Sequence, residues 1–484
     1  MSQHTDQAQT IIASSNITFG TSGARGLVEQ FSDDVCAAFT VAFLSALGPG
    51  ISLKRVAIGI DRRPSSPQMA AACAGAAKAL GISVNYYGIL PTPALALQAM
   101  SDEIPAIMIT GSHIPFDRNG IKFYRPDGEI TKTDENLIIH SDAPLPNYLS
   151  ALPDTSSRAS KNYIHRYTNL YPDNILAGLR IGLYEHSAAG RDLNIQILEQ
   201  LGAEIVSLGR TEQFVPIDTE AVSEEDKTSG KQWAKQHQLD AIFSTDGDGD
   251  RPLLANEKGE WLKGDVLGLL CAQELGIEAL AVPVSCNSAI EQSSQFTQVT
   301  RTRIGSPYVI EAMTQLAKKH NTVAGFEANG GFLLGSPLMT STGSLQSLPT
   351  RDAILPILVA LVAAKRNNTP LSGLTAALPD RYTASDRLTD FPTEHSKKLM
   401  TAWKASPESL KTDLKLPADI RAIDFMDGLR ATLWNHQVVH IRPSGNAPEL
   451  RCYCEAETPE QAEILLKKSL QALKQASMPP PNQE

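Results

Sequence analysis

Residues 55–90 read RVAIGIDRRPSSPQMAAACAGAAKALGISVNYYGIL. The apolar run Arg55–Ile60 is typical of a buried strand, and the alanine-rich stretch Met69–Leu80 is typical of a helix. Gly81 ends that helix, and Val84–Ile89 forms a second apolar run. The order strand, loop, helix, strand predicts layered α/β structure.

The same order of elements recurs further along the chain. Ile181–Tyr184 is followed by a helical stretch that ends at Leu201 and by the apolar segment Ala203–Leu208. A looser copy begins at Ala279–Val284 and continues through a helical pattern after Gly305. Because these units match in pattern, they predict two or three related α/β domains that arose by duplication.

Two breaks in the pattern predict domain boundaries. Residues 143–160 are rich in Pro and Ser, as linkers are. After Pro379-Asp380 the stretches ATLW, VVHI and LRCYCEA alternate like antiparallel strands, and a helix over Pro459–Gln475 follows. We therefore predict three α/β domains and a smaller α+β C-terminal domain, with these boundaries: 1–150, 151–256, 257–378 and 379–484.

The composition is that of an ordinary globular protein. Of 484 residues, 42% are hydrophobic and 20% are charged, which excludes a disordered or fibrous chain. The 43 basic and 53 acidic residues give a formal net charge of −10, so neither nucleic acid nor an anionic membrane is an expected partner. The longest apolar run, Ile354–Ala364, is far shorter than the roughly 20 residues of a membrane span.

Cysteine usage and the N-terminus favour a reduced, cytoplasmic protein. The six cysteines are dispersed and none forms a CxxC pair, which indicates neither a disulfide framework nor a zinc site. Cys452 and Cys454 alternate along a predicted strand, so we expect both to be buried on one face. The first ten residues lack the basic start and apolar core of a signal peptide.

A serine follows one of the apolar runs. Thr110–Pro115 reads TGSHIP directly after AIMIT, which places Ser112 at the carboxyl end of a strand, where open α/β sheets bind ligands. Its hydroxyl could act as a nucleophile, with His113 or Lys122 as the neighbour that handles the proton. Taken alone, a local turn hydrogen bond is the more common role of such a serine.

An acidic loop is the strongest local signal in the chain. Asp246, Asp248 and Asp250 alternate with glycines after the apolar stretch DAIF, so three carboxylates can converge on one hard cation. An EF-hand is excluded, because Arg251 stands where the sharp turn needs glycine and a strand precedes the loop. Two interpretations stay open: Mg²⁺ whose shell is completed by a substrate phosphate, or an aspartate nucleophile that accepts phosphate. A solvated acidic turn would not explain three clustered like charges.

Three further loops combine glycine with groups that bind anions or hydroxyls. Arg442–Pro448 (RPSGNAP) lies between two predicted strands and could hold a phosphate, although a hairpin without a ligand fits equally well. Gly325–Gly331 (GFEANGG) could hold sugar hydroxyls, and Thr21–Gly26 (TSGARG) could hold an anion; each is weak alone. A cleft where four domains meet would gather all five loops, which predicts phosphoryl transfer to or from a phosphorylated polyol.

The five motifs together resemble one family. TFGTSGARG, TGSHIPFDRNGIKFY, DGDGDR, GFEANGG and RPSGNAPELRCYCEA occur in the order and approximate spacing of the α-D-phosphohexomutase family, over nearly the whole chain. The resemblance implies four domains around a central cleft, with mixed sheets in three similar α/β domains. RPSGNAPELR and EANGG look most like the bacterial phosphomannomutases, which implies mannose 6-phosphate and mannose 1-phosphate as substrates. Glucose phosphates and, less readily, glucosamine phosphates stay open, and so does the choice between a monomer and a homodimer.

The resemblance also implies a mechanism. Ser112 would carry a phosphate and, with the three aspartates, would hold one Mg²⁺. The phosphate would pass to the sugar, and the resulting hexose 1,6-bisphosphate would turn end for end before its other phosphate returns to the serine. The implied roles are proton transfer by Lys122, support by His113, positive potential from Arg25 and Arg251, sugar contacts from Glu327 and Asn329, a further contact loop at Arg303 and Ser306, and binding of the non-reacting phosphate by Arg442, Ser444, Gly445 and Asn446.

Two positions depart from the family pattern. Many relatives have a histidine two residues after the serine of the sugar loop, whereas this chain reads Asn329-Gly330-Gly331, so any role of that histidine is absent or supplied elsewhere. Ile114 stands where an asparagine is usual, which removes one polar contact from the serine loop.

Two other classes of function stay open. A hydrolase with an aspartate nucleophile predicts an aspartyl-phosphate and leaves the serine loop without a purpose. A non-catalytic sugar-phosphate binder predicts binding without turnover, against which the presence of Ser112, Lys122 and the three aspartates argues.

Overall fold

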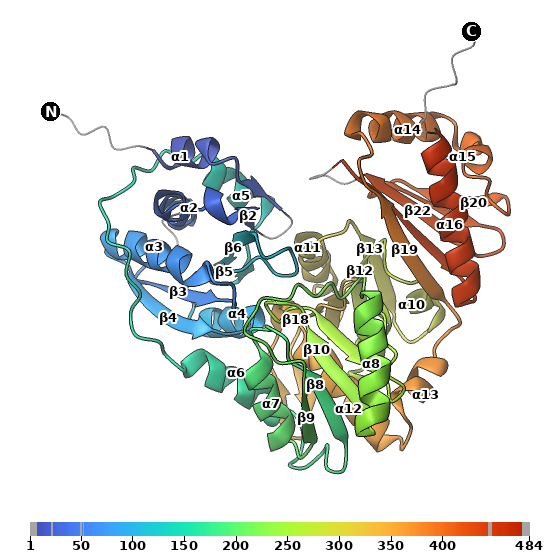
Figure 1. The fold of residues 1–484 in the computed structure, drawn as a ribbon, viewed down its shortest axis with the longest axis horizontal. Helices are drawn as coiled ribbons and strands as arrows, with labels where there is room; N and C mark the ends of the chain where they lie inside the picture. Colours follow the sequence, from blue (N-terminus) through green and yellow to red (C-terminus); the bar gives the residue numbers. More distant parts are fainter. Residues whose placement is uncertain (1–6, 21–22, 49–50, 52, 444–447, 477–484) are drawn as a thin grey trace, which may run out of the picture. The chain divides into compact units, whose positions relative to one another are not determined.

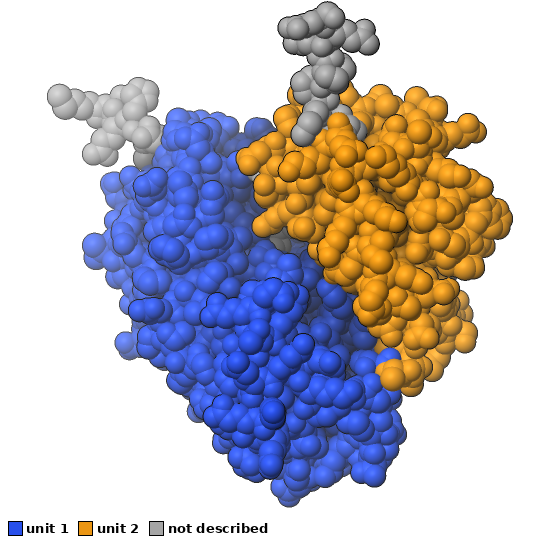
Figure 2. Space-filling model, turned by 45° about the vertical axis from the view of Figure 1, so that its right-hand side comes forward, with its two compact units in different colours: residues 1–281, 305–375 blue, residues 282–304, 376–484 orange. Residues whose placement is uncertain are grey.

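The computed structural model describes residues 7–20, 23–48, 51, 53–443 and 448–476 (Figure 1). The chain divides into two compact units, residues 1–281 with 305–375 and residues 282–304 with 376–484 (Figure 2). The break predicted near Pro379-Asp380 thus lies close to the boundary at residue 376, whereas the sequence pattern did not indicate that residues 282–304 belong to the C-terminal unit. Among the described residues, no helix is long and apolar enough to cross a membrane.

The first sheet has the strand order β1-β2-β6-β5-β3-β4, with β7 beside β6. β3 pairs in parallel with both β4 and β5, whereas β6 runs antiparallel to β5, so the sheet is mixed as predicted. Helices α3 and α4 pack on β3, whose residues 56–60 are buried, as in a strand covered on both faces. The strand bounds are β1 Thr18–Phe19, β2 Ala24–Leu27, β3 Arg55–Ile60, β4 Ser83–Ile89, β5 Ala106–Ile109, β6 Arg118–Arg125 and β7 Gly128–Glu129. The helices are α1 Ala8–Ser14, a 3₁₀ turn at Val28–Gln30, α2 Asp33–Ala46, α3 Ser66–Ala79, α4 Thr92–Ser101 and α5 Lys132–Ile139.

Two further sheets complete the first unit, and they carry the predicted repeats. The second has the order β11-β10-β8-β9, in which β8 is parallel to β9 and β10 while β11 is antiparallel. The third sheet contains the order β12-β14-β15-β18 among its five strands and again combines a parallel pair with antiparallel pairs. The strands are β8 Arg180–Tyr184, β9 Glu204–Leu208, β10 Ala241–Thr245, β11 Pro252–Ala255, β12 Ala279–Pro283, β14 Val323–Phe326, β15 Phe332–Leu334 and β18 Leu348–Asp352, with a hairpin of β16 Leu338–Thr340 and β17 Gly343–Leu345. The helices are α6 Arg158–Thr168, α7 Arg191–Gln200, α8 Glu224–His237, α9 Gly264–Glu274, α11 Ser306–Leu316, α12 Ile354–Arg366 and α13 Leu371–Ala376.

The second unit contains an antiparallel sheet of order β19-β23-β22-β21-β20. The predicted strands at ATLW, VVHI and LRCYCEA are confirmed, and Cys452 and Cys454 are buried with their Sγ atoms 3.9 Å apart, as the alternation predicted. The strands are β13 Gln298–Thr302, β19 Tyr382–Leu388, β20 Ile420–Asp424, β21 Leu429–Leu433, β22 Val438–Pro443 and β23 Leu450–Ala456; the helices are α10 Ala289–Gln292, α14 Thr393–Ala405, α15 Pro407–Asp413 and α16 Pro459–Ala476. The mixed α/β class is therefore confirmed, while the division into four domains stays a prediction.

Candidate active site

The serine loop follows β5, as predicted. Ser112 is 1% exposed, and its φ of 54° lies in the left-handed region that side chains rarely adopt. The backbone N–H of Ser112 donates to Thr110 Oγ1 over 2.8 Å. The buried guanidinium of Arg63 donates to four carbonyl oxygens of the loop and its exit, namely those of Ser112, Ile114, Pro115 and Arg118, at 2.5–3.1 Å. Arg63 therefore fixes the strained loop.

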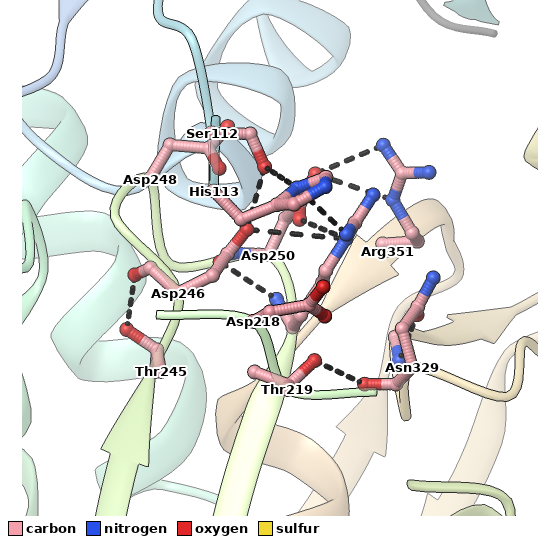
Figure 3. Close-up of polar contacts among 12 residues, drawn as sticks. Ser112, His113, Asp218, Thr219, Thr245, Asp246, Asp248, Asp250, Asn329 and Arg351 are labelled. Atoms are coloured by element: carbon pink, nitrogen blue, oxygen red, sulfur yellow. Dashed lines mark hydrogen bonds and ion pairs between the residues drawn. The ribbon is translucent and has the colours of Figure 1, made fainter. Parts of the chain in front are cut away.

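The acidic loop follows β10 and lies against the serine loop (Figure 3). Asp246 Oδ2 accepts a hydrogen bond from Ser112 Oγ over 2.6 Å, which joins positions 134 residues apart. A Cβ atom on Gly247 would lie 2.7 Å from the carbonyl oxygen of Ser112, so glycine is required for this approach. The two strongest signals of the sequence thus form one site within the first unit.

The three aspartates form a site that fits a divalent cation. Asp246, Asp248 and Asp250 are at most 1% exposed, and one oxygen from each lies within 4.8 Å of the others. The Oδ1 atoms of Asp248 and Asp250 are buried without a hydrogen-bond partner. Buried carboxylate oxygens without partners are unfavourable, and oxygen ligands of this kind are those that Mg²⁺ and Ca²⁺ prefer. The donor set therefore suits the predicted metal.

The electrostatics of the loop reflect this crowding. Burial and the charges of Asp248 and Asp250 raise the pKa of Asp246 well above its ordinary value. Burial also opposes ionisation of the other two, but the cations around them outweigh it and leave the pKa of both Asp248 and Asp250 below the ordinary value. Lys122 is the nearest of these cations, with Nζ 2.6 Å from Asp248 Oδ2 and 2.8 Å from Asp250 Oδ2.

Lys122 lies on β6, beside the strand that leads to the serine. Burial alone would lower the pKa of Lys122, but its two carboxylate partners raise it, so the ammonium is held as a cation here. A raised pKa opposes proton release from Lys122, which the implied role in proton transfer requires. The proton-transfer role of Lys122 stays a prediction.

The cationic residues predicted around the serine loop are also close to the aspartates. Arg251 Nη1 lies 2.9 Å from His113 Nδ1, which is itself 3.4 Å from Ser112 Oγ. Burial, followed by the charges of Arg251 and Arg25, lowers the pKa of His113 to about 2, so the imidazole is neutral and its Nδ1 accepts from Arg251. Burial and the charges of Arg251 and Arg351 lower the pKa of Arg25 to about 10, which still leaves it a cation.

The sugar loop after β14 belongs to the same unit. Glu327 and Asn329 are 4% and 7% exposed. Asn329 Oδ1 accepts from the N–H of Gly331 over 3.0 Å, and the Asn329 carbonyl accepts from the Thr219 hydroxyl over 3.0 Å (Figure 3). Arg351, which the sequence did not lead us to predict as a site residue, lies with its guanidinium 3.0 Å from the carboxylate of Glu327. Its signal was the pair of charged residues Arg351-Asp352, one residue before an apolar helix.

The remaining predicted residues have other surroundings. Ser306 begins α11, and its buried hydroxyl donates to Glu129 Oε2 over 2.6 Å. The hydroxyl proton of Ser306 is therefore already used in a hydrogen bond within the protein. Arg303 belongs to the second unit and is exposed. Arg442 lies on β22 of that unit, where Nε donates to Asp427 Oδ1 over 2.8 Å. Ser444, Gly445 and Asn446 lie outside the described residues.

Comparison with known proteins places this site in context. Family models described as phosphoglucomutase/phosphomannomutase alpha/beta/alpha domain I, alpha/beta/alpha domain III and C-terminal domain match residues 16–143, 263–382 and 388–469. The chain is 54% identical to a phosphomannomutase of Salmonella muenchen over 93% of this chain and 94% of that protein. It is 45% identical to a phosphomannomutase of Sinorhizobium fredii, over 94% and 98%. A phosphoglucomutase/phosphomannomutase family protein of Burkholderia thailandensis shares the fold at a TM-score of 0.73 and 18% identity, covering 97% of this chain and 98% of its own.

Proposed function

The chain belongs to the phosphoglucomutase/phosphomannomutase family, and on that premise we propose that it interconverts mannose 6-phosphate and mannose 1-phosphate. The contact between Ser112 Oγ and Asp246 Oδ2 at 2.6 Å is the observation that carries this proposal. It sets the hydroxyl that would carry phosphate against the carboxylates that would hold the metal. The choice of mannose rests on the relatives named phosphomannomutase at 54% and 45% identity.

The reaction begins from a phosphorylated Ser112. A sugar hydroxyl attacks the phosphorus, the bond between phosphorus and Ser112 Oγ breaks, and the proton of the sugar hydroxyl passes to Ser112 Oγ, which leaves as a hydroxyl group. The hexose 1,6-bisphosphate turns end for end, and Ser112 Oγ attacks the other phosphorus. The bond from that phosphorus to the sugar oxygen breaks, the serine proton passes to the sugar oxygen, and the isomeric monophosphate is released. Mg²⁺ held by Asp246, Asp248 and Asp250 would neutralise charge on the moving phosphoryl group.

The other predicted site residues would balance charge and bind the substrate. The guanidinium groups of Arg25 and Arg251 supply positive potential close to the serine, where phosphoryl charge has to be balanced. His113, neutral and hydrogen-bonded to Arg251, orients that arginine rather than donating a proton. Glu327 accepts hydrogen bonds from the sugar hydroxyls, and Arg442 binds the non-reacting phosphate through charge-assisted hydrogen bonds.

A side-by-side turnover assay tests the proposal. The chain is supplied with Mg²⁺, a hexose 1,6-bisphosphate primer, and in turn mannose 1-phosphate, glucose 1-phosphate and glucosamine 1-phosphate. We expect the highest kcat/KM for mannose 1-phosphate. Faster turnover of glucose or glucosamine phosphate would move the preference within the family, and release of inorganic phosphate without isomerisation would favour the aspartyl-phosphate hydrolase instead.

A further inference from the structure

Arg351 joins two loops that have different tasks. Its side chain is 3% exposed at the end of β18. Nη1 lies 3.0 Å from Glu327 Oε2 in the sugar loop. Nη2 and Nε lie 3.0 Å and 3.2 Å from Asp250 Oδ2 in the acidic loop, and Figure 3 labels Arg351 and Asp250. One planar guanidinium thus spans a carboxylate of each loop.

The sugar loop leaves room for this side chain by means of a glycine. A Cβ atom on Gly331 would lie 2.7 Å from both Cγ and Cδ of Arg351 and 2.9 Å from its Cβ. Any side chain at position 331 would therefore displace the arginine.

The backbone that carries Arg351 is fixed on both sides. Thr350 Oγ1 donates to Glu129 Oε1 over 2.7 Å, and Asp352 accepts hydrogen bonds from the hydroxyls of Tyr163 and Tyr167. Because Thr350 and Asp352 are hydrogen-bonded to separate elements, the backbone position from which the Arg351 side chain extends is fixed. A charged group on a fixed backbone can set the positions of the carboxylates that it contacts.

We propose that Arg351 is a positioning residue. It holds the carboxylate of Glu327, which contacts the sugar hydroxyls, at a set distance from the phosphoryl-transfer centre. In this way it determines which hexose phosphate the enzyme prefers. The inference rests on the proposed function, because it needs Glu327 to contact the sugar. Lysine cannot replace the arginine, since a single ammonium does not contact two carboxylates in the planar fork geometry of a guanidinium.

The test compares Arg351→Lys with a matched control. Arg381→Lys also removes a buried guanidinium from an ion pair, because the Arg381 side chain is 3% exposed and pairs with Glu455, and neither residue is assigned to the reaction. For each variant, kcat and KM are measured for mannose 1-phosphate and glucose 1-phosphate. We expect Arg351→Lys to lower the mannose-to-glucose ratio of kcat/KM by about tenfold or more, and Arg381→Lys to change it by less than about twofold.

A second pair of variants separates positioning from folding. In a Glu327→Gln background, Arg351→Lys should change the ratio by less than about twofold, because the carboxylate through which it acts is gone. Gly331→Ala keeps the arginine but displaces it, so it should reproduce the loss of preference. Its melting temperature shows whether the fold survives.

The outcomes distinguish the inference from its premise. A wild-type chain that turns over hexose phosphates, with the ratio unchanged in Arg351→Lys and in Gly331→Ala, overturns the inference alone. Equal, additive losses in the presence and absence of Glu327 do the same, because they show that Arg351 does not act through Glu327. A wild-type chain without mutase turnover refutes the proposed function, and the inference with it.

Discussion

Substitutions of Ser112 test two claims, that its hydroxyl carries the phosphate and that its backbone is strained. Its φ of 54° suits glycine, and its hydroxyl donates to Asp246 Oδ2 over 2.6 Å. We predict that Ser112→Ala and Ser112→Gly both lose mutase turnover, because neither has an oxygen that can carry phosphate. We also predict that the glycine variant is the more stable of the two.

The magnitude follows from three contributions. Both variants lose the buried hydrogen bond, which costs about 1–3 kcal/mol. Alanine keeps the left-handed backbone, at about 1–2 kcal/mol, and glycine relieves it. Glycine in turn loses about 0.4–1 kcal/mol more backbone entropy than alanine on folding. The free energy of unfolding of Ser112→Gly should therefore exceed that of Ser112→Ala by up to about 1.5 kcal/mol.

Two measurements read these effects separately. Turnover is followed with Mg²⁺ and hexose 1,6-bisphosphate present, and binding of mannose 6-phosphate by calorimetry should survive in both variants. Wild-type turnover in Ser112→Ala would refute the assignment of the serine. An alanine variant that melts above the glycine variant would refute the claim that the loop is strained at this residue.

Three other perturbations give separate outcomes. Mg²⁺ should stabilise the folded state of the wild type by about 2.7 kcal/mol at one hundred times its Kd, and so raise the melting temperature. Asp248→Asn should lose most of this rise in melting temperature. An equal rise in that variant would exclude Asp248 as a metal ligand. Arg442→Ala should raise the KM for mannose 1-phosphate through loss of a charge-assisted contact of about 1.5–3 kcal/mol, and an unchanged KM would count against phosphate binding there. Burial lowers the pKa of His440 to about 4, and its Nδ1 has no hydrogen-bond partner. Below pH 6.5 His440 therefore binds a proton in the unfolded chain, whereas in the folded chain it stays neutral down to about pH 4. The contribution of His440 to the free energy of unfolding is complete above pH 6.5 and falls by up to about 3 kcal/mol between pH 6.5 and pH 4. His440→Gln should flatten that part of a melting-temperature profile, and a profile identical to wild type would contradict the prediction.

The local sequence predicted those features that local sequence determines. The apolar run Arg55–Ile60 and the alternation in LRCYCEA predicted strands that the structure confirms, because burial on two faces or one leaves a readable pattern. The serine and acidic loops were predictable since glycine, serine and aspartate cluster directly after strands. Their contact could be expected because ligand sites form at the carboxyl ends of strands in open α/β sheets.

Long-range contacts were not predictable in the same way. Arg63 bonds carbonyl oxygens 49–55 residues away, and Arg351 pairs with Asp250 across 101 residues. Nothing beside either arginine in the sequence marks these partners. Residues 282–304 join the C-terminal unit through similar contacts, for Asn287 donates to the carbonyl of Arg381 over 2.7 Å.

Phosphopeptide mapping tests the central claim most directly. The chain is incubated with Mg²⁺ and hexose 1,6-bisphosphate, digested, and analysed by mass spectrometry in acid. We predict an acid-stable phosphate on the peptide that contains Ser112, at the hydroxyl that contacts Asp246. Acid-labile phosphate on Asp246 or Asp248, with none on Ser112, would contradict it.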